Sequence, residues 1–248
     1  FSAPATAVTA TTGLVALLGH PVGHSLSPRM QNAAFAAAGL DLLYLAFDVE
    51  PARLARAIRG LGALGAVGAN LTIPHKEAGA RLMSSLEGFA AVVGVVNTVV
   101  FRAGRPVGHN TDGPGLLTAA REAGAPDPAG ECCVVIGAGG AARAAAFALA
   151  QAGAQRLVVA NRTPGGAGRL GAEVVATMGI AAEGCPLAGP PWGEAGALAD
   201  VLPSAAIVVN ATPLGMDGET PPLGGEALVL RPRGAAVLDM AYCAGETP

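Results

Sequence analysis

Short apolar runs alternate with helical patterns along the first part of the chain. Three runs rich in Leu, Val and Ala are typical of strands in a sheet covered on both faces, and they span residues 13–19, 42–49 and 66–70. Between the first two, Ser27 is predicted to cap an alanine-rich helix that begins with Pro28 and continues to Ala38. Residues 51–61 have the pattern of a second, amphipathic helix. This alternation predicts a first α/β domain.

The second part of the chain is organised around a strand that runs straight into a glycine-rich turn. Residues 132–136 are apolar and β-branched, the turn begins at Gly137, and an alanine-rich helix is predicted from Ala141 to Gly153. Further apolar runs predict strands at residues 156–160, 206–210 and 236–240. Strands that alternate with helices in this way predict a parallel sheet. Glycine and proline interrupt residues 179–200, which give the weakest pattern.

A hairpin and a linker lie between these two parts. Residues 94–101 and 105–109 are predicted to pair with each other, and a cluster of Gly, Asn, Asp and Pro follows them, as in a linker. We place the domain boundary at Asp112 and expect a connecting helix over residues 116–122. The predicted domains are therefore residues 1–111 and 112–248.

Composition narrows the class of protein. Apolar residues make up 52% of the 248 residues and the mean hydropathy is +0.49, so a large core is available. A net charge of −3 leaves no basic face for nucleic acid. Polar residues interrupt the uncharged segment 1–28 and no positive stretch precedes an apolar run, so we predict neither a signal peptide nor a membrane span. Four cysteines without a C-x-x-C pair indicate a reduced, cytoplasmic protein with no metal site.

Lysine usage singles out one position. Of 15 basic residues, 14 are arginine and only Lys76 is lysine. Arginine can replace lysine on a solvated surface but cannot supply an amine that titrates, so Lys76 either has a chemical role or has persisted by chance. It follows Asn70 and Thr72 at the end of the third predicted strand, where α/β sheets place their ligands. We therefore expect these three residues to face a binding site.

The glycine-rich turn is the second candidate site. A strand, a G-x-G-G turn and the start of a helix present backbone N–H groups to an anion, as the pyrophosphate of a dinucleotide requires. Ala142 stands at the third place of the usual glycine fingerprint, a variant that the fingerprint allows. The alternative interpretation is a tight strand-to-helix turn without a ligand.

Eight short motifs lie in one order along nearly the whole chain. They are residues 19–28 (GHPVGHSLSP), 70–76 (NLTIPHK), 94–98 (GVVNT), 110–113 (NTDG), 137–141 (GAGGA), 161–163 (NRT), 210–212 (NAT) and 239–242 (DMAY). In this ordered set the chain resembles the shikimate dehydrogenase family. The resemblance implies a substrate domain and a Rossmann-like NADP-binding domain with a cleft between them. It also implies the reversible, NADPH-dependent reduction of 3-dehydroshikimate to shikimate, a step of chorismate and aromatic amino-acid biosynthesis.

The resemblance implies roles for residues of the substrate domain and its boundary. Shikimate carries a carboxylate and three hydroxyls, so its site needs short hydroxyl and amide groups; the substrate-binding candidates are Ser25, Ser27, Thr72, Asn97 and Tyr242. By resemblance the two serines take the carboxylate. Hydride delivery to a ketone builds negative charge on oxygen, and Lys76 and Asp112 resemble the pair that meets it. Which of the two passes the proton stays open, and a structural ion pair at the hinge is the alternative.

The preference for NADP or NAD can be inferred from the residues that follow the second strand of the predicted nucleotide-binding domain, at residues 156–160. The cofactor-binding candidates are Gly137, Ala138, Gly139, Gly140, Ala141, Asn161, Arg162, Thr163, Thr212 and Met240. NAD sites usually carry an acidic residue about 20 positions past the turn, but Arg162 stands here and suits the 2′-phosphate of NADP. Two positions depart from the family pattern: Gly166 replaces a second basic residue, leaving Arg169 as the next available, and Gln31 replaces a histidine.

Other assignments stay open at this stage. A relative acting on quinate or on an aminated shikimate analogue would share these motifs, as would a catalytically silent NADP-binding regulator, although Lys76 and Asp112 argue against silence. We expect a small-molecule substrate, no nucleic-acid or membrane partner, and either a monomer or a homodimer. Family members continue past the segment matching residues 245–248 with further helices, so we expect the intact protein to extend beyond Pro248.

Overall fold

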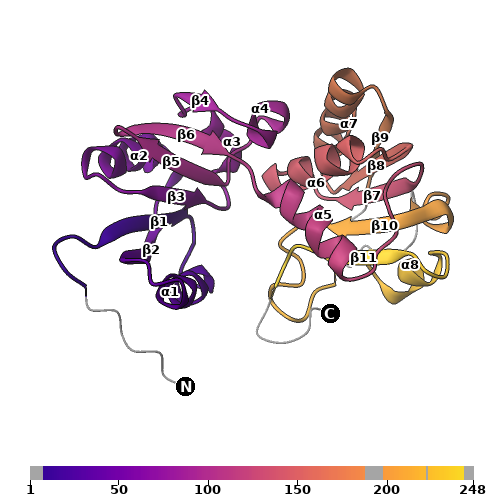
Figure 1. The fold of residues 1–248 in the computed structure, drawn as a ribbon. Coiled ribbons are helices and arrows are strands. Elements are labelled where there is room, and N and C mark those ends of the chain that lie inside the picture. The colour runs from indigo at the N-terminus through magenta and orange to yellow at the C-terminus, as the bar shows by residue number, and fades with distance from the viewer. Residues whose placement is uncertain (1–7, 188–197, 222, 243–248) are drawn as a thin grey trace. The chain divides into compact units, whose positions relative to one another are not determined.

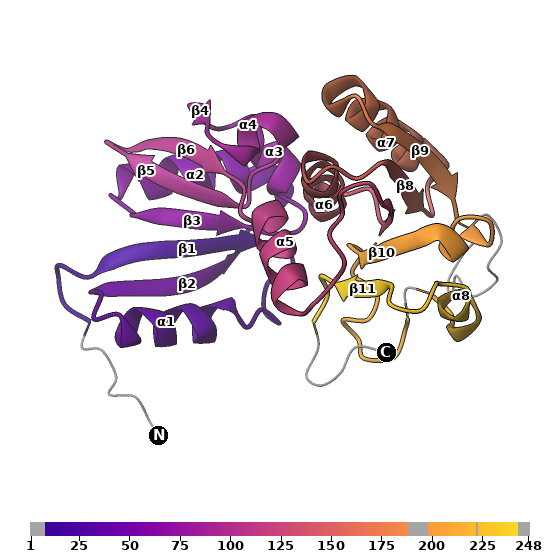
Figure 2. The same ribbon diagram turned by 45° about the vertical axis from the view of Figure 1, so that its right-hand side comes forward.

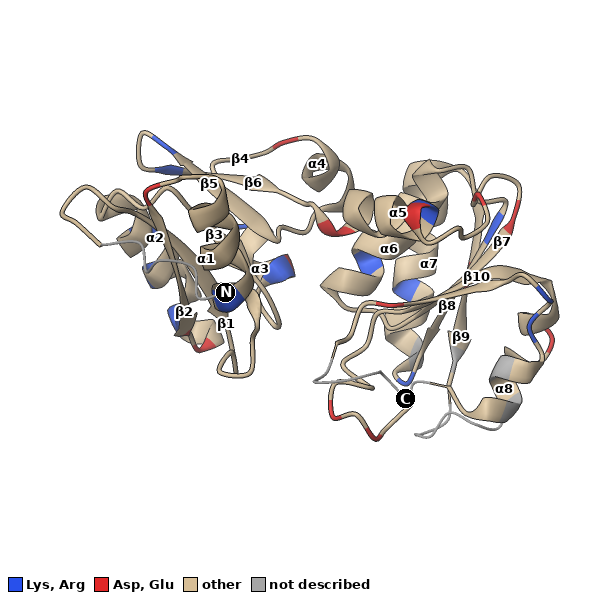
Figure 3. Ribbon diagram, turned by 60° about the horizontal axis from the view of Figure 1, so that its bottom comes forward, with Lys and Arg blue, Asp and Glu red and all other residues tan. Residues whose placement is uncertain are grey.

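The computed structural model describes residues 8–187, 198–221 and 223–242, and the chain divides into two compact units, Phe1–Thr111 and Asp112–Pro248. Each unit contains one β-sheet with helices packed on it (Figures 1 and 2). Basic and acidic positions are interspersed in both units (Figure 3). Among the helices of the described ranges, none has the length and apolar character needed to cross a membrane.

The first unit is built on a mixed sheet. Its strands are β1 (Gly13–Gly19), β2 (Leu42–Asp48), β3 (Gly68–Leu71), β4 (Ser85–Leu86), β5 (Thr98–Arg102) and β6 (Arg105–His109). Their order across the sheet is β2-β1-β3-β5-β6-β4, with β1 parallel to both β2 and β3. β5 pairs antiparallel with β3 and β6. The three predicted strands and the hairpin are confirmed.

Five helical segments connect these strands: α1 (Ser27–Ala37), a 3-10 turn (Pro51–Arg53), α2 (Leu54–Ala63), α3 (Lys76–Ala80) and α4 (Phe89–Val93). The predicted cap at Ser27 is wrong, because Leu26 takes the cap position and Ser27 is the first helical residue. The helix predicted over residues 51–61 is divided, because the Arg53 N–H donates to the Glu50 carbonyl and closes a 3-10 turn first. β5 begins four residues later than predicted, since α4 ends at a left-handed Gly94.

Strand β1 is buried on both faces. Successive residues of a strand point to opposite faces, and Leu17 and Leu18 accordingly belong to different hydrophobic clusters. The larger cluster contains Leu18 with Ile58 of α2, and the smaller one contains Leu17 with Tyr44 of β2. The apolar character of the predicted strand therefore reflects burial on two sides.

The second unit is built on a sheet in which every pair of strands is parallel. Its strands are β7 (Cys132–Ile136), β8 (Arg156–Asn161), β9 (Ala181–Pro186), β10 (Ala205–Asn210) and β11 (Ala236–Asp239), in the order β11-β10-β7-β8-β9. Its helices are α5 (Asp112–Glu122), α6 (Gly140–Gln151), α7 (Pro164–Met178) and α8 (Gly225–Val229). The predicted parallel sheet is confirmed, with α5 starting four residues and α6 one residue earlier than predicted.

Among the elements of this unit that were not predicted are α7 and β9. α7 opens with the glycine-rich sequence PGGAG, which lowers its helix propensity and hides the helical pattern. β9 has the sequence AAEGCP, which contains no β-branched residue, and it lies in the segment with the weakest pattern. Both elements form because tertiary packing compensates for weak local preference.

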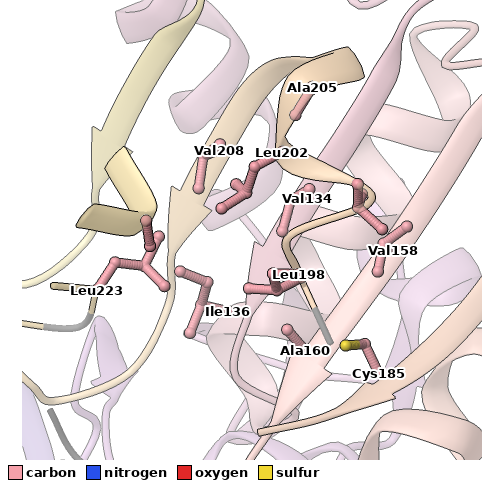
Figure 4. Close-up of a cluster of buried hydrophobic side chains, with 12 residues drawn as sticks. Val134, Ile136, Val158, Ala160, Cys185, Leu198, Leu202, Ala205, Val208 and Leu223 are labelled. Atoms are coloured by element: carbon pink, nitrogen blue, oxygen red, sulfur yellow. The ribbon is translucent and has the colours of Figure 1, made fainter. Parts of the chain in front are cut away.

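The core of the second unit lies on the central strands. Figure 4 shows Val134 of β7, Val158 of β8 and Val208 of β10 in one cluster, which also includes Leu202 and Leu223. Cys133 is fully buried outside this cluster, whereas Cys132 packs against it, as expected for neighbours on opposite faces. Burial raises the pKa of the Cys133 thiol to about 12, so it stays protonated at neutral pH.

Candidate active site

The loops of the first unit that carry predicted site residues leave from one edge of its sheet. β1, β2 and β3 are parallel, so their carboxyl ends lie together. Backbone hydrogen bonds then join the loops: the His20 N–H donates to Ile73 O at 2.9 Å and the Thr72 N–H to Leu18 O at 3.0 Å. The segment with the two serines and the segment with Thr72 are therefore held at the same place.

Lys76 is the first residue of α3 and is half-buried. Its backbone is fixed from two sides, because its carbonyl accepts the Val96 N–H at 3.0 Å and the preceding His75 is 1% exposed. The His75 Nε2 lies 2.7 Å from the carbonyl oxygen of Val49. The sole lysine thus stands on a rigid backbone at the carboxyl edge of the sheet.

Ser25 and Ser27 are both half-buried. The Ser25 Oγ accepts the Ser27 N–H at 3.2 Å, and the Ser25 N–H donates to Val22 O at 3.0 Å. Ser25 therefore has a structural contact at the start of α1 that the sequence left unassigned. One hydroxyl hydrogen and one lone pair of Ser25 are not used by these contacts, so the side chain can still bind a ligand.

Asn70 lies in β3 and Asn97 directly precedes β5, and the side chains of both residues are hydrogen-bonded to neighbouring polar groups. Asn97 is 9% exposed; its Nδ2 donates to Thr111 Oγ1 at 2.9 Å and its Oδ1 accepts the Thr111 N–H at 3.0 Å. The Asn70 Nδ2 lies 3.1 Å from Asn97 O and 3.2 Å from Thr98 Oγ1. The Asn70 Oδ1 accepts a hydrogen bond from the Tyr44 hydroxyl at 2.7 Å. The sequence predicted Asn70 and Asn97 to lie near a site. It assigned no role in the site to Tyr44 and Thr98, because both lie within predicted strands.

The remaining candidates for substrate chemistry lie in the second unit. Asp112 is the first residue of α5, and Tyr242 follows β11 with its side chain 46% exposed. Lys76 and Asp112 therefore belong to different units, and their pairing stays a prediction. The structure brings together the serines, Thr72, Asn97 and Lys76 of the first unit only.

The glycine-rich turn of the second unit connects β7 to α6. Gly137 has a φ of +118°, a conformation that side-chain-bearing residues rarely adopt, and a Cβ there would lie 3.1 Å from Ala211 O. Gly139 takes the cap position of α6, and a Cβ on it would meet no atom within 4 Å. The turn therefore combines open space with the N-terminal N–H groups of a twelve-residue helix, which is suited to an anion.

The segment after β8 carries Arg162, which is predicted to bind the 2′-phosphate of NADP. Asn161 ends β8 and its Nδ2 donates to Thr163 O at 3.1 Å, while Arg162 is exposed. A Cβ on Gly166 would lie 3.0 Å from Asn161 Nδ2 and 3.3 Å from Ala138 Cβ. A larger residue here would therefore require Asn161 or Ala138 of the glycine-rich turn to shift by a few tenths of an ångström.

Arg169 lies one turn further along α7 and is exposed. Its Nη1 would be 3.3 Å from a Cβ on Gly165, so the guanidinium reaches back over the first turn of the helix. Arg169 and Arg162 therefore flank the N-terminal end of α7.

The loop after β10 carries two further candidates. Thr212 bonds to Asn210 Oδ1 through both its N–H, at 3.0 Å, and its hydroxyl, at 2.7 Å. The Met240 N–H donates to Asn210 O at 2.9 Å, and the Asn210 Nδ2 donates to Asp239 Oδ1 at 2.8 Å. Asn210, which is 2% exposed, therefore holds Thr212 and Met240 at the carboxyl edge of the second sheet.

No cluster of three or more His, Cys, Asp or Glu residues that could hold a metal ion occurs within the described ranges. The three cysteines described there, Cys132, Cys133 and Cys185, are all free thiols.

The chain is similar to known proteins over most of its length. The family described as shikimate dehydrogenase substrate binding domain matches residues 17–99. Shikimate dehydrogenase (NADP(+)) of Moorella thermoacetica is 53% identical, covering 84% of this chain and 68% of the relative. The enzyme of the same name from Methanopyrus kandleri is 45% identical, covering 97% and 85%. The crystal structure of shikimate 5-dehydrogenase from Thermus thermophilus with NADP(H) and shikimate is 37% identical with a TM-score of 0.76, covering 93% of this chain and 79% of that one.

Proposed function

The chain belongs to the shikimate dehydrogenase family, and from this membership we propose that it catalyses the reversible, NADPH-dependent reduction of 3-dehydroshikimate to shikimate. The relatives from Moorella thermoacetica and Methanopyrus kandleri carry the name shikimate dehydrogenase (NADP(+)), so activity toward quinate or an aminated analogue, or a silent regulator, is not favoured. The observation in the structure that supports the proposal is that the segments carrying Ser25, Thr72 and Lys76 follow parallel strands at one edge of the first sheet and are joined by backbone hydrogen bonds.

NADPH, when bound, supplies the hydride. The glycine-rich turn fits its pyrophosphate, because Gly137 requires its positive φ and Gly139 borders open space at the start of α6. Arg162 and Arg169 would hold the 2′-phosphate through charge-assisted hydrogen bonds. Asn161, Thr163, Thr212 and Met240 would complete the cofactor side.

The residues of the first unit would bind and orient the substrate. Ser25 and Ser27 would take its carboxylate, and the hydroxyl and amide groups of Thr72, Asn97 and Tyr242 would take its hydroxyls. Reduction adds a hydride to the carbonyl carbon and a proton to its oxygen. The Lys76 cation would stabilise the negative charge that develops on this oxygen, and either Lys76 or Asp112 would supply the proton.

The experiment that tests the proposal is an assay of the purified protein. Shikimate with NADP⁺ is expected to give a rise in nicotinamide absorbance, and quinate or NAD⁺ a much slower one. Turnover of quinate with NAD⁺ at a rate equal to or above that of shikimate with NADP⁺ would overturn the assignment.

We also propose a cytoplasmic enzyme that is a monomer or a homodimer. The free thiols of the described cysteines support a reducing compartment. Sedimentation equilibrium at several protein concentrations distinguishes the two assembly states.

A further inference from the structure

A chain of side-chain hydrogen bonds crosses the first unit from β2 to the residue before Asp112. It runs from the Tyr44 hydroxyl to the Asn70 amide, on to the Thr98 hydroxyl and the Asn97 amide, and ends at Thr111 Oγ1, with distances of 2.7, 3.2, 2.9 and 2.9 Å. Tyr44 is 2% exposed and Asn97 9%. All four contacts are partly buried, and the hydrogen-bond chain ends at the exposed Thr111. Partial exclusion of water strengthens these hydrogen bonds relative to fully solvated ones.

Two contacts with the protein backbone fix the donor-to-acceptor direction of this series of hydrogen bonds. The Asn97 carbonyl can only accept, so the Asn70 atom at 3.1 Å from it is the amide nitrogen. The Thr111 N–H can only donate, so the Asn97 atom at 3.0 Å from it is the amide oxygen. Neither amide can be reversed without losing a backbone partner.

The hydroxyls between these points then have only one arrangement. Thr98 Oγ1 accepts from Asn70 Nδ2, so its own hydrogen is donated to Asn97 Oδ1. The Asn70 Oδ1 receives the hydrogen of the Tyr44 hydroxyl. Both amide hydrogens of Asn70 are used by Asn97 O and Thr98 Oγ1. These contacts leave the Asn70 side chain one acceptor lone pair, on Oδ1, for a further hydrogen bond.

Tyr44 is itself held firmly. The Asn32 side chain of α1 contacts the Tyr44 backbone twice, with Nδ2 donating to the carbonyl at 2.9 Å and Oδ1 accepting the N–H at 2.8 Å. Phe35 of the same helix packs against the Tyr44 ring at a centroid distance of 6.4 Å. Contacts to both the backbone and the ring of Tyr44 therefore hold its hydroxyl in position to donate to Asn70.

We propose that Tyr44 and Thr98 are positioning residues of the dehydrogenase. They would fix the amide of Asn70, a residue expected to face the binding site, so that it meets the substrate only as an acceptor. This inference rests on the proposed function. An acceptor at that point binds a hydroxyl group and rejects a carbonyl oxygen, which could bind only to the amide hydrogens. The donor-to-acceptor direction of these hydrogen bonds would therefore favour a substrate with a hydroxyl group over one with a keto group at the position that faces Asn70.

The test compares Tyr44→Phe and Thr98→Val with Thr98→Ser. The first two keep the shape of the side chain and remove the hydroxyl, and the third restores it. Tyr44→Phe removes the hydroxyl that donates to Asn70, and Thr98→Val removes the hydroxyl that contacts both Asn70 and Asn97. Both variants are expected to raise KM for shikimate about five- to tenfold. KM for NADP⁺ is expected to stay within about twofold, and Thr98→Ser to recover most of the wild-type KM for shikimate.

A merely structural role predicts a different result. It would lower the melting temperature of both variants and leave KM for shikimate unchanged, and that outcome overturns the inference. An inactive wild-type protein would instead refute the proposed function. In that case the side-chain amide NMR signal of Asn70, assigned through its loss in Asn70→Ala, decides the matter. A shift of this signal in both variants supports the fixed amide, and an unchanged signal overturns it.

Discussion

The Nε2 of His75 donates a hydrogen bond to the Val49 carbonyl oxygen, 2.7 Å away, and so ties the residue before Lys76 to the loop that follows β2. A carbonyl only accepts, so this buried imidazole carries a proton on Nε2. The contact links two of the three parallel strand ends at which the proposed site lies.

We expect His75→Phe to destabilise the protein. The ring is retained, but the Val49 carbonyl loses its donor, which costs about 1–3 kcal/mol in the free energy of unfolding measured with urea. The exposed His24 offers a control, since His24→Ala is expected to change this free energy by less than about 0.5 kcal/mol. Equal stability of His75→Phe and wild type would show that the contact does not anchor the loop.

Lys76→Ala is expected to fold normally and to lose about 10²-fold or more in kcat, with little change in KM for shikimate, as removal of a transition-state contact should. Lys76→Arg keeps the charge without a titratable amine and separates charge stabilisation from proton donation. Comparing the pH–rate profiles of Lys76→Arg and Asp112→Asn identifies the proton donor. Wild-type kcat in Lys76→Ala would remove the lysine from the mechanism.

Arg162→Ala is expected to weaken NADPH about 10- to 100-fold and NADH very little, because the charge-assisted contact to the 2′-phosphate exists only with NADPH. Titration of nicotinamide fluorescence gives both dissociation constants. The exposed Arg121 of α5 provides a control for the loss of one positive charge. Equal weakening of NADPH and NADH would make Arg162 structural and Arg169 the candidate.

Gly166→Arg tests whether the departure from the family pattern is imposed by packing. The added Cβ would approach Asn161 Nδ2 to 3.0 Å and Ala138 Cβ to 3.3 Å, so the Asn161 side chain or the glycine-rich turn would have to yield by a few tenths of an ångström. We therefore expect NADPH affinity to stay the same or to fall despite the extra charge. A tighter dissociation constant in this variant would show that the turn accommodates the side chain.

Ser25→Ala is expected to raise KM for shikimate about tenfold while the affinity for NADP⁺ is unchanged, because a hydrogen bond to a charged carboxylate is lost. Ser84→Ala, at an exposed serine of the same unit, serves as the control. An unchanged KM would leave Ser25 with only its contact to the Ser27 N–H.

The strands at the centre of both sheets could be predicted because burial on two faces leaves a continuous apolar run, as Leu17 and Leu18 illustrate. Ser25, Thr72 and Lys76 could be placed near a site because they follow parallel strands. The hydrogen bond from the Tyr44 hydroxyl to Asn70 could not be predicted. Hydrophobic periodicity indicates which residues are buried, but it does not indicate which polar groups meet across a sheet. The cap of α1 could not be predicted from the Ser27-Pro28 pattern, because Leu26 takes the cap position without a side-chain hydrogen bond and Ser27 is already helical.

The paired contacts of Asn32 with the Tyr44 backbone have a consequence for the behaviour of the protein in solution. β2 is the last strand on its side of the sheet, and the exposed Leu45 and Phe47 flank that border. By occupying one outward N–H and one outward carbonyl, the amide of Asn32 takes the hydrogen bonds that a strand from another molecule would need. The side chain that contacts the Tyr44 backbone thus also blocks one of the positions on the edge strand to which a strand of another molecule could pair.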